Sequence, residues 1–306
     1  MNLQKTIRKE IIFKGVGLHS GAMCEVILKP APSDAGITFT RTEGAHKTAI
    51  PALSRYVIDT TLSTTLGKNG VTIQTVEHLM AALWGLDIDT VEIEVRGPEI
   101  PILDGSSEPF VKKIKKAGIQ ELDQLKKVFV ITRPVAIVEG DRYCYLLSSR
   151  TPKMTCSIEF PHALVPKQKL EMKLDPKSFV QEISRARTFC FLKDVELLKQ
   201  KGLIRGGSLE CAIVLDEKKI LNPEGVRFKD EFVRHKILDS IGDMALFGMK
   251  ILGHFISHKA GHELHAKLIR KVLTQECGYI LGEGALERAV QDRVPFQESL
   301  FQSASV

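Results

Sequence analysis

Long hydrophobic runs are absent from this 306-residue sequence, as are several common signature motifs. No apolar stretch approaches the roughly 18–20 residues that a membrane-spanning helix needs. The start, MNLQKTIRKEI, is charged and no apolar segment follows it, so we expect no secretory signal peptide. Neither G-x-x-x-x-G-K-[ST] nor G-x-G-x-x-G occurs, which excludes the most familiar nucleotide-binding loops.

Cysteine and the larger aromatic residues are also scarce. The six cysteines are scattered and form no C-x-x-C pair, so we expect no disulfide framework. We interpret them as buried apolar residues of a reduced, cytoplasmic chain. One Trp and four Tyr, without interleaved basic residues, argue against a stacking surface for nucleic acids.

The remaining composition is that of a globular protein. Hydrophobic residues make up 43% and charged residues 26%, which excludes disordered and collagen-like chains. The length predicts about two domains of roughly 150 residues each. The chain has 43 basic and 37 acidic residues, which gives a net charge of +6. This charge suggests an anionic partner, such as a phosphate, a nucleic acid or a membrane face, without choosing among them.

The two halves of the chain show a similar order of expected elements. In each half, strand-like segments lead to an amphipathic helix, over 72–86 and over 230–249. A charged linker is expected near 120–127, and a Gly- and His-rich loop after residue 249. Because strands cluster apart from helices, we predict an α+β fold of two similar sheet-plus-helix domains packed against each other. We place the domains at 1–122 and 128–278, and expect a flexible tail over 279–306.

The helix expected over 230–249 carries a possible two-point metal chelate. His235 and Asp239 are four residues apart, so their side chains share one helix face. Imidazole and carboxylate are both ligands of first-row metals. Taken alone, however, a His and an Asp at this spacing are more often a hydrogen-bonded pair without a metal.

Two residues of the helix expected over 72–86 strengthen the metal interpretation. Glu77 and His78 are adjacent, and the opposite face of their helix is apolar. With His235 and Asp239, His78 would complete a His₂Asp set that leaves one position open, which is typical of catalytic zinc. Glu77 would then serve as a general base, although alone it would be interpreted as a solvated carboxylate.

Four of the nine histidines lie in the segment 254–265. They could form a second metal site, but their irregular spacing favours one functional histidine. His262 opens the last expected helix, over 262–273, and is the best placed to reach a cleft. Because the helix dipole disfavours its protonation, a carboxylate such as Asp243 would have to keep it charged. We interpret the Lys-rich segment 112–116 as a solvated helix face, with a membrane-surface patch as the alternative.

Five segments resemble, in order, the signature segments of the UDP-3-O-acyl-N-acetylglucosamine deacetylases, the zinc amidases of lipid A biosynthesis in Gram-negative bacteria. They are TVEHLMAAL (75–83), GPEIPILDGSSEPF (97–110), SRARTFCF (184–191), FVRHKILDSIGD (232–243) and KAGHELH (259–265). The resemblance covers about residues 3–275. It implies two similar α+β domains with the active site in the cleft between them.

The resemblance also implies roles for individual residues. One catalytic Zn²⁺ would be held by His78, His235 and Asp239, a ligand set that also suits Fe²⁺. Glu77 would be the general base for the zinc-bound water, and His262, supported by Asp243, the general acid. The other implied residues are Thr188 as oxyanion donor, Lys236 near the polar groups of the substrate, Phe189 at the sugar, Phe160 and Lys259 near the nucleotide, and Phe191, Leu203 and Leu18 along or near the acyl passage.

The implied reaction releases acetate and a free amine from a UDP-3-O-(3-hydroxyacyl)-N-acetylglucosamine. The partner would therefore be an acylated UDP-sugar and not a nucleic acid. We expect a monomer that can make transient contact with the cytoplasmic face of the membrane. Ser63 stands where some relatives carry a cysteine close to the metal, which puts a fourth protein ligand in doubt.

Two other interpretations stay open at this point. One is a zinc amidase that acts on another acylated sugar or peptide. The other is a nucleotide-sugar-binding or RNA-binding protein with a vestigial metal site. A measurement of bound metal would distinguish an amidase from a binding protein. One metal ion per chain would favour an amidase, because a binding module has no need for it.

Overall fold

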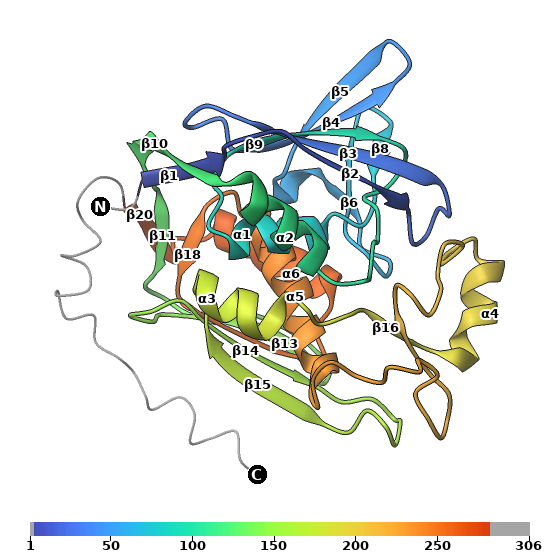
Figure 1. Ribbon diagram of the computed structural model, residues 1–306. Helices are drawn as coiled ribbons and strands as arrows, with labels where there is room; N and C mark the ends of the chain where they lie inside the picture. Colours follow the sequence, from blue (N-terminus) through green and yellow to red (C-terminus); the bar gives the residue numbers. More distant parts are fainter. Residues whose placement is uncertain (1–2, 282–306) are drawn as a thin grey trace.

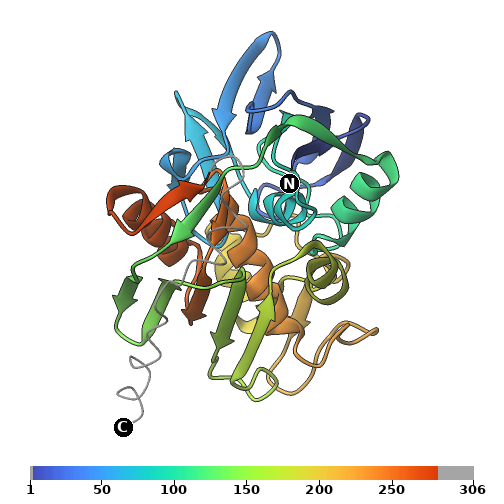
Figure 2. The ribbon, with the colours of Figure 1, turned by 90° about the vertical axis from the view of Figure 1, so that its left-hand side faces the viewer.

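The computed structural model describes residues 3–281, and its helices lie between two sheets (Figure 1). Each sheet has five strands. The main helices between them are α1 (Glu77–Gly85), α2 (Glu108–Ala117), α5 (Glu231–Ala245) and α6 (His262–Thr274). A view turned by 90° shows the same order of layers (Figure 2). The predicted α+β fold is confirmed.

The first sheet has the strand order β2-β3-β9-β4-β5. These strands are β2 (Ile11–Val16), β3 (Met23–Pro30), β4 (Ile37–Glu43), β5 (His46–Pro51) and β9 (Val91–Arg96). Within this sheet only β4 and β9 pair in parallel. Val91, Ile93 and Val95 of the central strand β9 are fully buried, so one face of the sheet packs on the core.

The second sheet repeats this topology with the order β12-β13-β19-β14-β15. Its strands are β12 (Val135–Glu139), β13 (Arg142–Leu147), β14 (Lys153–Ile158), β15 (Gln168–Lys173) and β19 (His254–His258). Here too a single pair, β14 with β19, is parallel. The shared topology agrees with the expectation of two similar halves, while the domain boundaries stay a prediction.

Strand β19 corrects the expectation of a loop after residue 249. His254, Ile256 and His258 alternate with the buried Phe255 and Ser257, which is the period of a strand. The short β18 (Lys250–Leu252) precedes it. Three of the five residues of HFISH are polar or charged, so this segment was predicted as a loop although it forms the central strand of the second sheet.

The segment expected as a linker near 120–127 is also largely a strand. β10 (Ile119–Leu125) pairs antiparallel with β1 (Leu3–Ile7). Its side chains are all exposed or half-buried, so its composition suggested a loop. The chain then enters β11 (Val128–Ile131), which lies between β18 and β20 (Gly278–Leu281). Strand β20 takes up the start of the predicted tail, and the rest of that tail lies outside the described residues.

The remaining elements between residues 3 and 281 lie outside the two five-stranded sheets. They are the 3₁₀ turn η1 (Ser54–Tyr56), β6 (Val57–Asp59), β7 (Thr65–Lys68), β8 (Val71–Ile73), α3 (Pro176–Ser178), the π-helical turn η2 (Phe179–Ile183), β16 (Phe189–Phe191), α4 (Leu192–Gln200) and β17 (Ile213–Leu215). Helix α4 projects at the edge of the molecule (Figure 1). None of the helices between residues 3 and 281 combines the length and the apolar character needed to cross a membrane.

Helices α1 and α5 pack tightly against each other in the middle of the protein. Leu79, Met80 and Leu83 of α1 are fully buried, and Glu77 and His78 on the same helix are buried as well, so α1 lies inside the core. At the closest approach, a Cβ on Gly242 of α5 would overlap the backbone carbonyl of Glu77. Gly242 therefore allows the first turn of α1 to touch α5.

We expect Gly242→Ala to lower the free energy of unfolding by about 1–3 kcal/mol, because the added methyl group overpacks the contact between the helices. Urea denaturation followed by circular dichroism measures this effect. Gly261→Ala is the matched control, since a Cβ there meets no atom within 4 Å. Equal stabilities of the two variants would contradict this account of the helix contact.

Candidate active site

The start of α1 is held in place by a buried carboxylate. Thr75, just before the helix, has φ 58°, which is strained for a β-branched residue. Its hydroxyl donates to Glu99 Oε1 at 2.7 Å, and Glu99 is fully buried. Glu99 also accepts the backbone N–H groups of His19 and Ser20 at 3.0 and 2.8 Å. One carboxylate thus fixes both the first turn of α1 and the loop that faces it.

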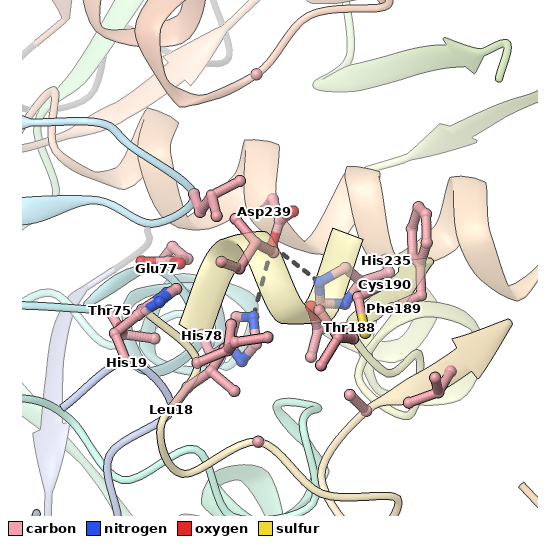
Figure 3. A pocket seen from close by; sticks show the side chains of 18 of the residues that line it. Leu18, His19, Thr75, Glu77, His78, Thr188, Phe189, Cys190, His235 and Asp239 are labelled. Carbon is pink, nitrogen blue, oxygen red and sulfur yellow. Dashed lines mark ion pairs between the residues drawn. The ribbon is translucent and has the colours of Figure 1, made fainter. Parts of the chain in front are cut away.

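Three potential ligand atoms meet where α1 contacts α5 (Figure 3). His78 Nε2 lies 3.5 Å from Asp239 Oδ1, and His235 Nε2 lies 3.3 Å from the same oxygen. All three ligand atoms are within 4.8 Å of one another and their side chains are buried. The structure thus brings together the three residues predicted as metal ligands. Ser63 is also buried.

The donor set fits a tetrahedrally coordinated metal. Ligand bonds of about 2.1 Å at tetrahedral angles separate donor atoms by about 3.4 Å, close to the two separations observed. His235 Nδ1 lies 3.1 Å from the Ala186 carbonyl, so Nδ1 carries the proton and Nε2 presents its lone pair. Burial lowers the pKa of His235 to about 3, although Asp239 opposes this shift. The imidazole is therefore neutral, as a metal ligand must be.

Glu77 lies beside this cluster in the first turn of α1. Its side chain is 3% exposed, and its Oε2 accepts the backbone N–H of Thr64 at 3.0 Å. Burial raises the pKa of Glu77, against the opposing effect of His262 and His78. A buried carboxylate with a raised pKa is better suited to accept a proton than an ordinary surface glutamate.

His262 and Asp243 form a charged pair across the site. His262 Nδ1 lies 2.7 Å from Asp243 Oδ2, and His265 Nδ1 lies 2.8 Å from the same oxygen. Burial alone would lower the pKa of His262, but Asp243, with Glu77 and Asp239, raises it to about 9. The predicted supporting carboxylate is thus in contact with the histidine. Asp243, His262 and His265 thus form a second close set of possible ligand atoms. Their mutual hydrogen bonds explain why they lie together, so no second metal is needed to explain it.

The loop before β16 is anchored to the beginning of α5. Glu231, in the first turn of α5 and fully buried, accepts the backbone N–H and the guanidinium Nε of Arg187, both at 3.0 Å. Thr188 follows, and its backbone N–H donates to the Gly105 carbonyl at 2.9 Å. Within residues 3–281 the Thr188 hydroxyl takes part in no hydrogen bond. It lines the cavity and is available to a ligand.

A cavity of about 620 Å³ opens in front of the ligand cluster. It is lined by both halves of the chain, including Leu18 from the first and Phe189 from the second. Lys236 also lines it; its ammonium group donates to Asp239 Oδ2 at 2.9 Å and lies 5.7 Å from the Phe189 ring centroid. Away from the ligands the wall is mainly apolar, with Leu62, Leu192, Val195, Leu198, Ile204, Leu209, Val214 and Leu221.

Four of the residues that the resemblance places along the substrate lie outside the lining of this cavity. Phe160 and Phe191 form an aromatic cluster with Phe189, with ring centroids 5.5–5.6 Å from Phe160. Lys259 is paired with Asp141 at 2.8 Å. Leu203 is half-buried, while its neighbour Ile204 lines the wall.

Several residues of the site escaped the sequence reasoning. His19 lines the cavity and is 3% exposed, and neither of its ring nitrogens has a hydrogen-bond partner within residues 3–281. Thr64 contacts Glu77, and His265 contacts Asp243. A weak signal for His19 was available in GVGLHSG, a lone histidine in a glycine-rich turn next to Leu18. Thr64 has no distinguishing local pattern, whereas His265 belongs to the histidine-rich segment 254–265, in which only His262 was given a role.

Two imidazoles, a carboxylate and a buried glutamate at the end of a cavity are the parts of a metal-dependent hydrolase. Comparison with known proteins gives the family. The family model of UDP-3-O-acyl N-acetylglycosamine deacetylase (LpxC) matches residues 4–274. The chain is 51% identical over 276 residues to the UDP-3-O-acyl-N-acetylglucosamine deacetylase of Myxococcus xanthus, covering 90% of this chain and 88% of that protein.

Two further relatives carry the same name. The protein of Anaeromyxobacter dehalogenans is 47% identical, with 90% of this chain and 89% of the relative covered. That of Bdellovibrio bacteriovorus is 42% identical, with 91% and 92% covered. The chain belongs to the UDP-3-O-acyl N-acetylglycosamine deacetylase family. The predicted family and enzyme class, a deacetylase and hence a hydrolase, are confirmed, and the family implies a metal cofactor.

We expect chelator-treated protein to bind about one equivalent of added Zn²⁺ per chain, the probe ion for a His₂Asp set. His78→Ala removes one of the three ligands and should weaken binding by at least about 100-fold. Competition with a chromophoric chelator measures the affinity. His254→Ala is the control, because His254 lies in β19 and bonds to Thr155. Unchanged affinity in His78→Ala would exclude His78 as a ligand.

Proposed function

We propose that this enzyme hydrolyses the N-acetyl group of a UDP-3-O-(3-hydroxyacyl)-N-acetylglucosamine, a step of lipid A biosynthesis, with Zn²⁺ on His78, His235 and Asp239. The observation that carries the proposal is the buried His₂Asp cluster, which lies beside Glu77 and His262 at the end of a largely apolar cavity. Relatives of 42–51% identity are named for this reaction. Fe²⁺ suits the same ligands.

The metal, when bound, would lower the pKa of a water molecule and polarise the acetyl carbonyl. Glu77 accepts a proton from the attacking water, whose oxygen bonds to the carbonyl carbon. The Thr188 hydroxyl donates a hydrogen bond to the oxyanion that develops on the substrate. Lys236 holds Asp239 and neutralises part of the negative charge near the reacting atoms.

The leaving nitrogen needs a proton, because an amide anion is a very poor leaving group. His262 supplies it while Asp243 stabilises the imidazolium. The C–N bond then breaks, and acetate and the free glucosamine amine are released. Glu77 and His262 therefore act as base and acid in one turnover, and each has a buried partner suited to its role.

The remainder of the substrate would lie along the cavity and its rim. Phe189 and Leu18, which line the cavity, would contact the sugar and the acyl chain. The aromatic cluster of Phe160 and Phe191 would lie near the nucleotide and at the entrance of the acyl passage, and Lys259 would meet a phosphate. The apolar wall that includes Val195, Leu198 and Ile204 supports the acyl passage.

We infer a monomeric enzyme that works in the cytoplasm and can touch the membrane face. The apolar side of α2 (Phe110, Val111 and Ile114) is buried, while Lys112, Lys113, Lys115 and Lys116 are exposed. Any contact of α2 with the membrane would therefore be electrostatic and would not insert a helix face.

The decisive test is single-turnover acetate release from UDP-3-O-acyl-N-acetylglucosamine, with protein of known metal content. Activity should vanish on chelation and return with about one equivalent of Zn²⁺. Glu77→Gln should keep the metal and lose about 10²–10⁴-fold in rate, the usual contribution of a general base. Glu92→Gln, exposed on β9, is the control. Metal-loaded protein that releases no acetate would refute the proposed substrate, and full activity of Glu77→Gln would refute the base.

The pH profile tests His262. Its raised pKa means that the proton is held below about 9 and lost above it, so kcat/KM should fall as the pH rises through this value. Asp243→Asn removes the main charge that raises the pKa and should move the alkaline limb to lower pH. Glu92→Gln, which changes an exposed carboxylate of β9, should leave the limb in place. An alkaline limb that stays at the same pH in Asp243→Asn would contradict the assignment.

A further inference from the structure

Thr64 contacts both carboxylates that flank the candidate metal cluster. It precedes β7 and is 2% exposed. Its hydroxyl lies 2.6 Å from Asp243 Oδ1, and its backbone N–H donates to Glu77 Oε2 at 3.0 Å. Its carbonyl also accepts the N–H of Val76, the residue before α1, at 3.2 Å. A single residue is therefore bonded to the start of α1 and to α5.

The other hydrogen bonds of Asp243 show that the Thr64 hydroxyl is the donor in its hydrogen bond to this carboxylate. Oδ2 already faces the Nδ1 atoms of His262 and His265, so the Thr64 hydroxyl donates to the other oxygen. Three donors on one carboxylate leave it a single orientation. Because His262 is bonded to this carboxylate, a rotation of Asp243 would displace the imidazole.

The hydrogen bond at Glu77 acts in the same way on the opposite side of the site. The Thr64 N–H occupies Oε2, and within residues 3–281 no hydrogen bond reaches Oε1. Oε1 is therefore the oxygen available to take a proton from water. The backbone N–H of Thr64 holds Glu77 and its hydroxyl holds Asp243. A shift of either carboxylate would therefore move Thr64 and disturb the other carboxylate.

We propose that Thr64 is a positioning residue that holds the general base Glu77 and the Asp243–His262 acid pair in a fixed relation across the contact of α1 and α5. The inference rests on the function proposed above. Water attack and amine protonation occur on opposite sides of one small acetamide, so they demand this fixed geometry. Thr64 itself touches no reacting atom.

Three variants separate positioning from simple filling of space. Thr64→Val keeps the shape and removes the hydroxyl, Thr64→Ser keeps the hydroxyl, and Thr65→Val changes the neighbouring buried threonine. We expect Thr64→Val to lower kcat by about 10–100-fold, the effect of a small misplacement, with KM and metal content unchanged. Thr64→Ser should regain most of kcat, and Thr65→Val should match the unmodified enzyme.

The measurements are steady-state acetate release, metal content and urea unfolding on the full chain. Wild-type kcat in Thr64→Val, or a change confined to KM, would overturn the proposal. If Thr64→Val does not fold, Thr64→Ala replaces it; failure of both to fold would show a structural role only and would also overturn it. The parallel Glu77→Gln variant distinguishes the two proposals: if it is inactive while Thr64→Val is fully active, only the positioning role fails.

Discussion

The close contact between the first turn of α1 and the middle of α5 determines the geometry of the whole site. Gly242 lets the backbone of Glu77 approach α5, and this approach brings His78 to within 3.5 Å of Asp239. The ligand cluster, the cavity wall and the loop with Thr64 are arranged around that contact. Because the packing of a core tolerates little added volume, the chemistry depends on a backbone approach that only glycine permits.

The site also concentrates ionisable groups away from water. Glu77, Asp239 and Asp243 are all buried, and an isolated buried charge is costly unless it is paired. Lys236 and His262 supply the compensating charge, each within 2.9 Å of a carboxylate. The same pairing that makes these charges tolerable keeps a proton on His262 at neutral pH. The stability of these buried charges and the acid role proposed for His262 therefore depend on one set of hydrogen bonds.

Patterns in the local sequence predicted those features that depend on the periodicity of a single helix. The four-residue spacing of His235 and Asp239 placed both on one face of α5. The residue pattern also suggested Asp243 as the partner of His262, and the family segments supplied Thr188. Strand β19 was missed because its outward histidines resemble a loop, and β10 because an exposed strand has a polar composition. Thr64 could not be found from the sequence, since its importance arises from contacts with Glu77 and Asp243, which lie far along the chain. His19 had only the weak signal of a lone histidine in a glycine-rich turn. The exact lining of the cavity was equally inaccessible from the sequence, since Ile204 lines it and its neighbour Leu203 does not.

The division of the proposed ligand set between the two halves has a consequence for how the protein folds and binds its metal. His78 belongs to α1, whereas His235 and Asp239 belong to α5, so a metal bound here is a crosslink between two halves of similar topology. During synthesis the first half leaves the ribosome without a complete ligand set, and the ion can be captured only after α5 has docked. Once captured, it opposes separation of the halves by mass action. A metal held by the proposed ligand set would therefore be retained only when both halves are folded and in contact.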